Sequence, residues 1–252
     1  MYRRLTAIGI LAAQITLAQS PDAANYVYEL WYQVYSNKSR GFNQYFQKLK
    51  EADLQTNSGR QRFVDIQPYS NTRVISMPAK ELGEFDNRST SSAVFNKAFG
   101  EAEYHKYAAL YNEAQITATS VIRKYRNDLS LNRDKHVRER TATTAYTFVT
   151  VFPLKGPVFE QLWLKAVEAY KKVEPDIILI AAQTIVGSGA QYVVARPLKS
   201  YGEFEGDLTP EQAVEKAFGA AERDNFNRLV ASSIKTWDTV LMDKGDMDTN
   251  VR

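Results

Sequence analysis

The sequence predicts an α+β protein in which one β-α-β-β-α-β unit is used twice and the two antiparallel sheets bury each other. Three observations favour this fold class. They are an internal repeat, an order of predicted strands and helices that both copies share, and an aromatic content of 15 Tyr and 12 Phe among 252 residues. Aromatic side chains are enriched in strands, where they fill the faces of sheets.

The chain repeats itself at a spacing of 119 residues. Aligning Val74–Glu103 with Val193–Glu222 requires no gap and leaves 13 of 30 positions identical. The densest match pairs NKAFGEAE with EKAFGAAE, and both copies contain the phrase Pro-x-Lys-x-x-Gly-Glu-Phe followed by an acidic residue. One supersecondary unit used twice therefore determines the fold. A solenoid is excluded because the period is long and the copies are only two.

The second copy shows the order of elements more clearly. Its predicted elements are a strand at 145–154, a helix at 156–175, a hairpin at 176–198, a helix at 209–234 and a strand at 235–245. The first strand is rich in aromatic and β-branched residues, and the first helix has apolar residues at helical spacing. A Gly-Ser-Gly turn divides the hairpin. Thr209 as N-cap, Pro210 at the first helical position and Gln212 at the capping-box position begin the second helix.

The first copy follows the same order with weaker signals. Its elements are a strand at 25–36, a helix at 41–55, a hairpin at 62–78 turning at Tyr69–Asn71, a helix at 91–115 and a strand at 116–126. We therefore place the first repeat at 25–127 and the second at 145–248. The charged, Thr-rich stretch 128–144 lacks apolar periodicity and is predicted to be a linker.

Two repeated features predict local structure. Gly100 and Gly219 fall inside the predicted second helices, where glycine costs about 1 kcal/mol relative to alanine. We expect close approach of the helix to the sheet or to the neighbouring helix; retention of ancestral residues after a recent duplication is the alternative. The stretch RPLKSYGEFEG, residues 196–206, is predicted to be a turn after the third strand. There Pro197 would end the ladder, Gly202 would allow the bend and Phe204 would pack beneath it.

A split β-α-β unit of this kind is the ferredoxin-like arrangement, whose sheet carries helices on one face and leaves the other bare. Two bare faces in one chain can cover each other. On this element order and duplication, residues 25–248 resemble a tandem member of the dimeric α+β-barrel superfamily. That group includes antibiotic-biosynthesis monooxygenases, NIPSNAP-like proteins and chlorite-dismutase-like haem proteins. The resemblance implies an intramolecular α+β barrel and supports fold better than function.

The N-terminus has the pattern of a secretory signal peptide. A positive MYRR segment precedes a mostly apolar run, and small residues lead to predicted cleavage after Ala18. The run is short for a bilayer span; a buried helix and a retained anchor are the alternatives. We expect a periplasmic or secreted protein with no membrane contact after cleavage.

Composition excludes several classes of function. Without Arg3 and Arg4, 30 basic residues face 29 acidic ones, so no basic field remains to attract nucleic acid. The chain has no cysteine, which excludes disulfides, thiolate metal sites and a lipoprotein anchor. Its two histidines, His105 and His136, form no metal cluster. Self-association stays open.

Candidate site residues come from the first strand and the third strands. Glu29, Trp31 and Gln33 share one strand face and could be pocket groups or ordinary sheet residues. The same face of the second repeat is predicted to carry Thr147 and Val149, with Val151 or its neighbour, and no carboxylate. Arg73 and Arg196 are the cations that could face a ligand carboxylate; surface roles are the alternative.

Three functions remain open from the sequence. The favoured hypothesis is an exported module that binds a small apolar or aromatic ligand or a partner, or is structural. The monooxygenase branch implies cofactor-independent oxygenation in a pocket between sheet and helices. A haem protein would need an axial ligand, for which His105 is the candidate because His136 lies in the predicted linker. We expect no cofactor.

Overall fold

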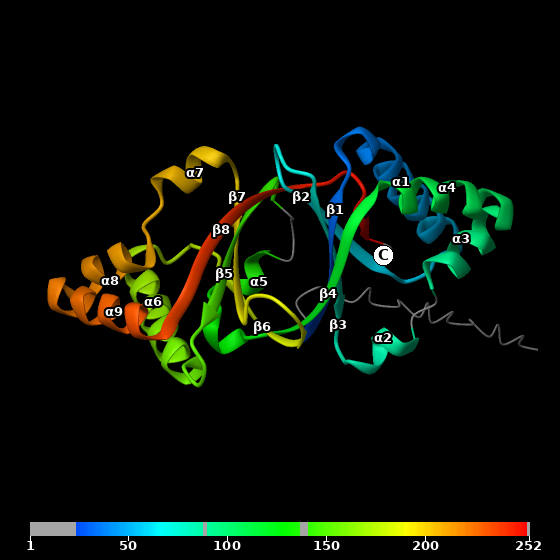
Figure 1. Ribbon diagram of the computed structural model, residues 1–252. Coiled ribbons are helices and arrows are strands. Elements are labelled where there is room, and N and C mark those ends of the chain that lie inside the picture. The colour runs from blue at the N-terminus through cyan, green and yellow to red at the C-terminus, as the bar shows by residue number, and fades with distance from the viewer. Residues whose placement is uncertain (1–23, 88–89, 137–140, 251–252) are drawn as a thin grey trace, which may run out of the picture.

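Eight strands form a closed antiparallel barrel at the centre of the protein (Figure 1). The computed structural model describes residues 24–87, 90–136 and 141–250. The strands are β1 (Tyr26–Val34), β2 (Gln61–Ile66), β3 (Thr72–Ala79), β4 (Gln115–Tyr125), β5 (Thr143–Val151), β6 (Ile180–Gly187), β7 (Tyr192–Leu198) and β8 (Ile234–Lys244). A two-residue strand, β9 (Thr249–Asn250), adds to β2 at the end of the chain.

The two repeats close the barrel by sharing edges. Within the first repeat the strand order is β2-β3-β1-β4, and within the second it is β6-β7-β5-β8. The last strand of each repeat pairs with the second strand of the other, β4 with β6 and β8 with β2. The predicted α+β fold of two ferredoxin-like repeats in an intramolecular barrel is therefore confirmed.

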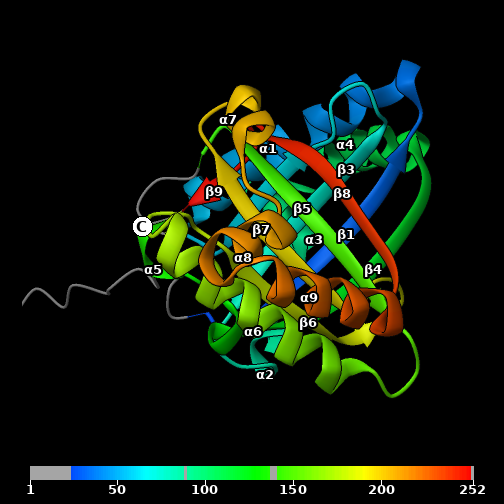
Figure 2. The same ribbon diagram turned by 90° about the vertical axis from the view of Figure 1, so that its left-hand side faces the viewer.

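Helices cover the barrel on two opposite sides (Figures 1 and 2). The first repeat contributes α1 (Ser39–Thr56), α3 (Ser91–Phe99) and α4 (Glu101–Ala114), and the second contributes α6 (Gly156–Val173), α8 (Pro210–Phe218) and α9 (Ala220–Ser233). Shorter helices are α2 (Gly83–Asn87), α5 (Arg133–His136) and α7 (Tyr201–Gly206), with 3₁₀ turns at η2 (Ser36–Lys38) and η3 (Asn127–Leu129). Each strand thus has one face towards helices and one towards the barrel interior.

The second helix of each repeat is broken, which corrects the prediction of one continuous helix. Gly100 separates α3 from α4 with φ 85° and ψ 166°, and Gly219 separates α8 from α9 with φ 92° and ψ 172°. This backbone region is accessible almost only to glycine. The expected close approach is also wrong, because a Cβ at either position would meet no heavy atom within 4 Å. Both glycines serve backbone conformation.

The beginning of α8 is as predicted. The hydroxyl of Thr209 accepts from the backbone N–H of Gln212, whose side chain in turn accepts from the N–H of Thr209. Pro210 occupies the first helical position. The capping box thus satisfies two backbone donors that helix geometry leaves unpaired.

The repeated Gly-Glu-Phe phrase forms a short helix, so the predicted simple turn is wrong. It lies in α2 in the first repeat and in α7 in the second, and Gly202 is helical. Glu203 accepts the N–H of Lys199 at 2.6 Å, and Glu84 accepts the N–H of Lys80 at 2.9 Å. The glutamate recurs because it holds the chain where it leaves the third strand. Pro197 lies within β7, and Phe204 is exposed.

The connection between the repeats is structured at its start. Leu129 in η3 and Leu131 are buried in the core of the second repeat, and Leu131 forms a bridge with Leu179. The Leu129 carbonyl accepts from the indole of Trp163 at 2.9 Å. Residues 137–140 of this segment, the N-terminal residues 1–23 and the predicted cleavage site lie outside the described residues.

Candidate functional site

Two predicted site residues, Glu29 and Trp31, meet inside the barrel. The carboxylate of Glu29 accepts from the indole Nε1 of Trp31 at 2.9 Å and from Nε of Arg123 on β4 at 3.0 Å. The Arg123 side chain is 3% exposed, so this ion pair is shielded from water. Arg123 also donates to the carbonyl of Ala190 at 3.1 Å and to the hydroxyl of Thr184. The cluster joins the two repeats with its polar groups paired inside the protein.

Aromatic rings from both repeats occupy the barrel next to this cluster. Trp31 meets Phe148 edge to face, with ring centroids 5.3 Å apart. Phe148 stacks on Tyr146, whose hydroxyl donates to Asp65 on β2 at 3.1 Å. The interior thus holds packed rings and paired polar groups.

Strand register shows which residues of the two repeats correspond. Trp31 lies opposite Val74 and Phe148 opposite Val193, and these two valines are 119 residues apart. Trp31 therefore corresponds to Phe148, and by the same register Glu29 corresponds to Tyr146. The sequence comparison with Thr147, Val149 and Val151 was wrong, because Val149 and Val151 belong to the helix-facing core. The shift arises because the first strands are offset by 117 residues, whereas the repeats are offset by 119 only from β3 and β7 onward.

The other four candidates lie apart from the cluster. Gln33 is exposed at the end of β1 and accepts from Thr72 at 3.1 Å. Arg73 lies opposite Tyr32 on the helix-facing side of the sheet and donates to the carbonyls of Ser70 and Thr72. Burial lowers the pKa of its guanidinium.

Arg196 and His105 are also held by nearby residues. Arg196 on β7 forms an ion pair with Asp207 just after α7, and burial lowers the pKa of Arg196. The His105 side chain is 68% exposed on α4 and lies 3.3 Å from Glu101. The structure thus brings together only Glu29 and Trp31 of the six candidates, with Gln33 on the same face.

The space between sheet and helices in the first repeat is filled by aromatic rings. Tyr45 stacks on Tyr111 with centroids 4.6 Å apart, and the hydroxyls of Tyr32 and Tyr111 are 2.7 Å apart. Burial raises the pKa of Tyr45 to about 12 and raises that of Tyr32 further. These phenols stay protonated at neutral pH and are poor bases. The other buried rings of the cluster are Phe42, Phe46 and Phe95.

The corresponding space in the second repeat is filled in a different way. Phe159, Trp163 and Tyr170 of α6 pack on Tyr192 and Trp237. Phe159 and Tyr192 have ring centroids 4.5 Å apart, and Trp163 and Trp237 are 6.0 Å apart. Both sheet–helix layers are thus packed cores.

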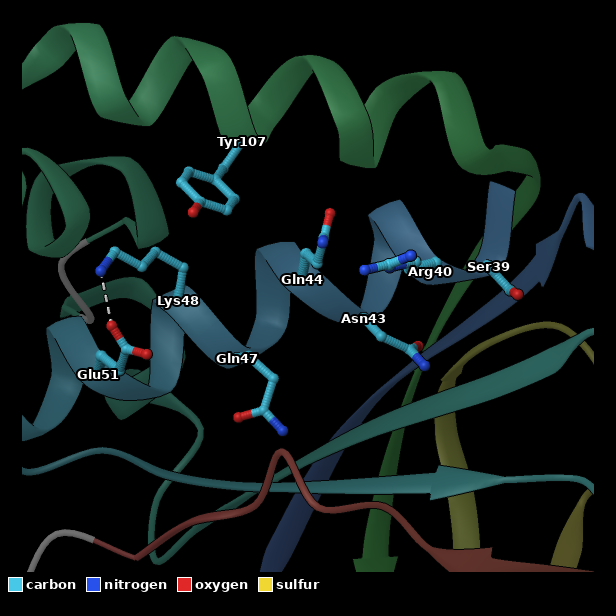
Figure 3. Close-up of a pocket in the computed structure, with 8 residues that line it drawn as sticks. All are labelled: Ser39, Arg40, Asn43, Gln44, Gln47, Lys48, Glu51 and Tyr107. Atoms are coloured by element: carbon cyan, nitrogen blue, oxygen red, sulfur yellow. Dashed lines mark hydrogen bonds and ion pairs between the residues drawn. The ribbon is translucent and has the colours of Figure 1, made fainter. Parts of the chain in front are cut away.

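A groove lies on the outer side of the first repeat, along α1 (Figure 3). Its volume is about 470 Å³. All of its lining residues are polar or aromatic: Ser39, Arg40, Asn43, Gln44, Gln47, Lys48 and Glu51 from α1, and Tyr107 from α4. We call it the α1 groove. These side chains recur at helical spacing because they form the solvent stripe of α1, whose opposite stripe carries Phe42, Phe46 and Leu49.

Two groups in the α1 groove have unused bonding capacity. The amide oxygen of Asn43 is buried and has no hydrogen-bond partner. Arg40 is exposed, and among the described residues it has neither a hydrogen bond nor an ion pair. Lys48, in contrast, is held 2.6 Å from Glu51 and lies over the ring of Phe99. Figure 3 shows Tyr107 pointing from α4 towards α1, with Arg40 and Gln44 on the facing helix.

Sequence reasoning missed Arg123, Arg40 and Asn43. Arg123 could be found only from strand register, because its partner Glu29 is 94 residues away. Arg40 and Asn43 belong to a polar helix stripe, which has the same pattern as any solvated face.

Comparisons with known proteins show the fold alone. No protein-family model matches, and no curated protein matches the sequence. Among solved structures, an anthrone oxidase-like protein has a TM-score of 0.58 at 12% identity, over 90% of this chain and 94% of that one. A candidate monooxygenase from Lactobacillus acidophilus has a TM-score of 0.52 at 9% identity, over 90% and 97%. A candidate chlorite dismutase has a TM-score of 0.53 at 8% identity, over 88% and 96%. The chain therefore has the fold of the dimeric α+β-barrel superfamily.

Two features are absent from the part of the chain that the structure describes. No helix among them is both long and apolar enough to cross a membrane. Within the same ranges, no group of three or more His, Cys, Asp or Glu side chains is placed to hold a metal ion.

Proposed function

We propose that this protein is an exported binding module that holds a small hydrophilic anion in the α1 groove. The observation that carries the proposal is Arg40, a guanidinium in the groove that has no hydrogen bond or ion pair among the described residues. A guanidinium binds carboxylates through paired, charge-assisted hydrogen bonds. The exposed side-chain amides of Gln44 and Gln47 can exchange hydrogen bonds with hydroxyl groups. A sugar acid carries both a carboxylate and hydroxyl groups. We therefore propose a sugar acid instead of the apolar ligand that the sequence led us to expect.

The shape of the groove supports a small ligand. About 470 Å³ lies within the range of small-molecule sites. Tyr107 supplies a ring face, and the amides of Gln44 and Gln47 supply further donors and acceptors. Lys48 adds positive charge, partly offset by Glu51. The N-terminal signal pattern supports export, and with it contact with extracellular or periplasmic solutes.

Oxygenation and haem binding are supported less well. An oxygenase pocket between sheet and helices would need to displace the rings of Tyr32, Tyr45 and Phe95, which are nearly fully buried. A haem ligand would need His105 to turn inward from the exposed side of α4. We propose that the protein acts without a cofactor. Oxygen uptake with an anthrone, or a Soret band after haem addition, would contradict this.

Calorimetric titration with galacturonate tests the binding proposal. Galactose is the matched uncharged probe. We expect galacturonate to bind, galactose to bind at least about tenfold more weakly, and Arg40→Gln to reduce affinity for galacturonate by about tenfold or more. Arg228→Gln, on α9 of the other repeat, is the control and should leave affinity unchanged. Equal binding of both sugars, or no effect of Arg40→Gln, would disprove the assignment.

A further inference from the structure

Among the residues that the structure describes, no strand covers the outer edge of the first half of β4. β4 pairs with β1 from Gln115 to Lys124, but it pairs with β6 only from Val121 onward. Residues 116–120 are all exposed. Alternate residues of a strand direct their backbone N–H and C=O groups to the same side, so this stretch presents unpaired backbone groups.

This edge lacks the charges and prolines that often protect an edge strand, although its pairing with β1 has a register shift at Ile116. Its sequence is Ile-Thr-Ala-Thr-Ser, without a charge, a proline or a glycine. Exposed strand edges usually carry charged residues, especially lysine, or prolines and bulges. The apolar side chains of Ile116 and, at the end of β6, Ile185 and Val186 are each more than 40% exposed. The uncovered edge is therefore bordered by apolar surface.

The second repeat provides an internal comparison. The corresponding part of β8 pairs with β5 throughout and meets β2 only at Asp243 and Lys244. Its edge is equally uncovered, but it carries exposed Lys235 and Asp238 where β4 has Ile116 and Thr119. The second repeat thus has charged residues at this strand edge, and the first repeat has none there.

We propose that residues 116–120 of β4 pair with the same residues of a second copy of this chain, antiparallel about a twofold axis. Centred on Ala118, such pairing places Thr117 opposite Thr119 of the other copy. Thr–Thr pairs stabilise antiparallel strands, and an uncharged edge meets its copy without repulsion. The two sheets would continue across the axis by strand addition. This inference is independent of the α1 groove.

Sedimentation velocity of the purified protein over a range of concentrations tests the proposal. We expect a dimer that Thr117→Lys weakens by at least about tenfold in dissociation constant, because the lysine enters the twofold contact twice. Thr236→Lys is the matched control: Thr236 lies 119 residues later on the exposed edge of β8. It should leave the dimer intact. A monomer at all concentrations would overturn the proposal, as would equal effects of the two substitutions.

Cysteine crosslinking locates the contact. The chain contains no cysteine, so Ala118→Cys introduces a single thiol. Directly opposite residues of antiparallel strands have Cα atoms about 4.5–5.5 Å apart, within disulfide range. Mild oxidation should yield a covalent dimer from Ala118→Cys and none from Thr236→Cys. If the protein forms a dimer that Ala118→Cys does not crosslink, the contact does not involve this strand edge and the proposal is wrong. The same conclusion follows if removing residues 1–23 abolishes the dimer.

Discussion

Trp31 and Phe148 meet edge to face at 5.3 Å, and they are corresponding residues of the two repeats. The contact lies inside the barrel, where the repeats face each other. We expect Trp31→Ala to lower the free energy of unfolding by about 3 kcal/mol, because a large ring leaves a cavity there. Urea denaturation measures this loss. Tyr35→Ala, at an exposed ring, should change stability by less than about 0.5 kcal/mol. A double-mutant cycle with Phe148→Ala should give a coupling of about 1 kcal/mol; zero coupling would contradict the contact.

The buried ion pair of Glu29 and Arg123 predicts that removing one of the two charges costs more stability than the charge pair itself contributes. Glu29→Gln removes one charge and leaves the Arg123 guanidinium buried without a counter-charge. The expected loss is about 3 kcal/mol. The double variant Glu29→Gln with Arg123→Met should lose less than the two single variants together. Denaturant midpoints of all four proteins test this, and strict additivity would show that the pair is not coupled.

The ion pair between Glu160 on α6 and Arg126 at the end of the first repeat links the two repeats. It predicts that the free energy of unfolding falls in acid. The Glu160 carboxylate accepts from Arg126 at 2.6 Å, and chiefly this hydrogen bond lowers the pKa of Glu160 below 4.5. A carboxyl with a lowered folded-state pKa stabilises the protein above its unfolded pKa. That stabilisation, about 1 kcal/mol for this partly exposed pair, is lost as pH falls below about 4.5. Glu160→Gln should flatten the stability profile between roughly pH 5 and 3. Lys171→Gln, an exposed charge change on the same helix, should not.

The backbone conformation of Gly219 predicts that a substitution lowers stability even though the new side chain would meet no neighbour. The φ of 92° places Gly219 where other residues are strained, so Gly219→Ala should cost about 1–3 kcal/mol although its Cβ would have free space. Gly206→Ala is the matched control because Gly206 also has free space but lies in α7 without a positive φ. Thermal denaturation should show no loss of stability for the control. Equal effects would contradict the conformational reason.

The repeat made most of the fold predictable. Thirteen identities at one spacing, with a capping box at Thr209, fixed the order of elements. The break at Gly219 was missed because glycine inside an amphipathic pattern looks like a tolerated defect, whereas its backbone angles are visible only in three dimensions. Glu29 and Trp31 were placed on the correct face by alternation alone. Their partners Arg123 and Phe148 could not be predicted, because strand register across the barrel is set by long-range pairing.

Barrel closure by exchanged edges has a consequence for the order of folding. The pairs that close the barrel are far apart in sequence; next to them, the backbone N–H of Val64 donates to the carboxylate of Asp248, 184 residues later. Forming such contacts requires closing a long loop, which makes them late events. Until the second repeat leaves the ribosome, the first repeat carries β2 and β4 with open edges on both sides of its sheet. A nascent chain is therefore most prone to pair with the wrong molecule when it is half made.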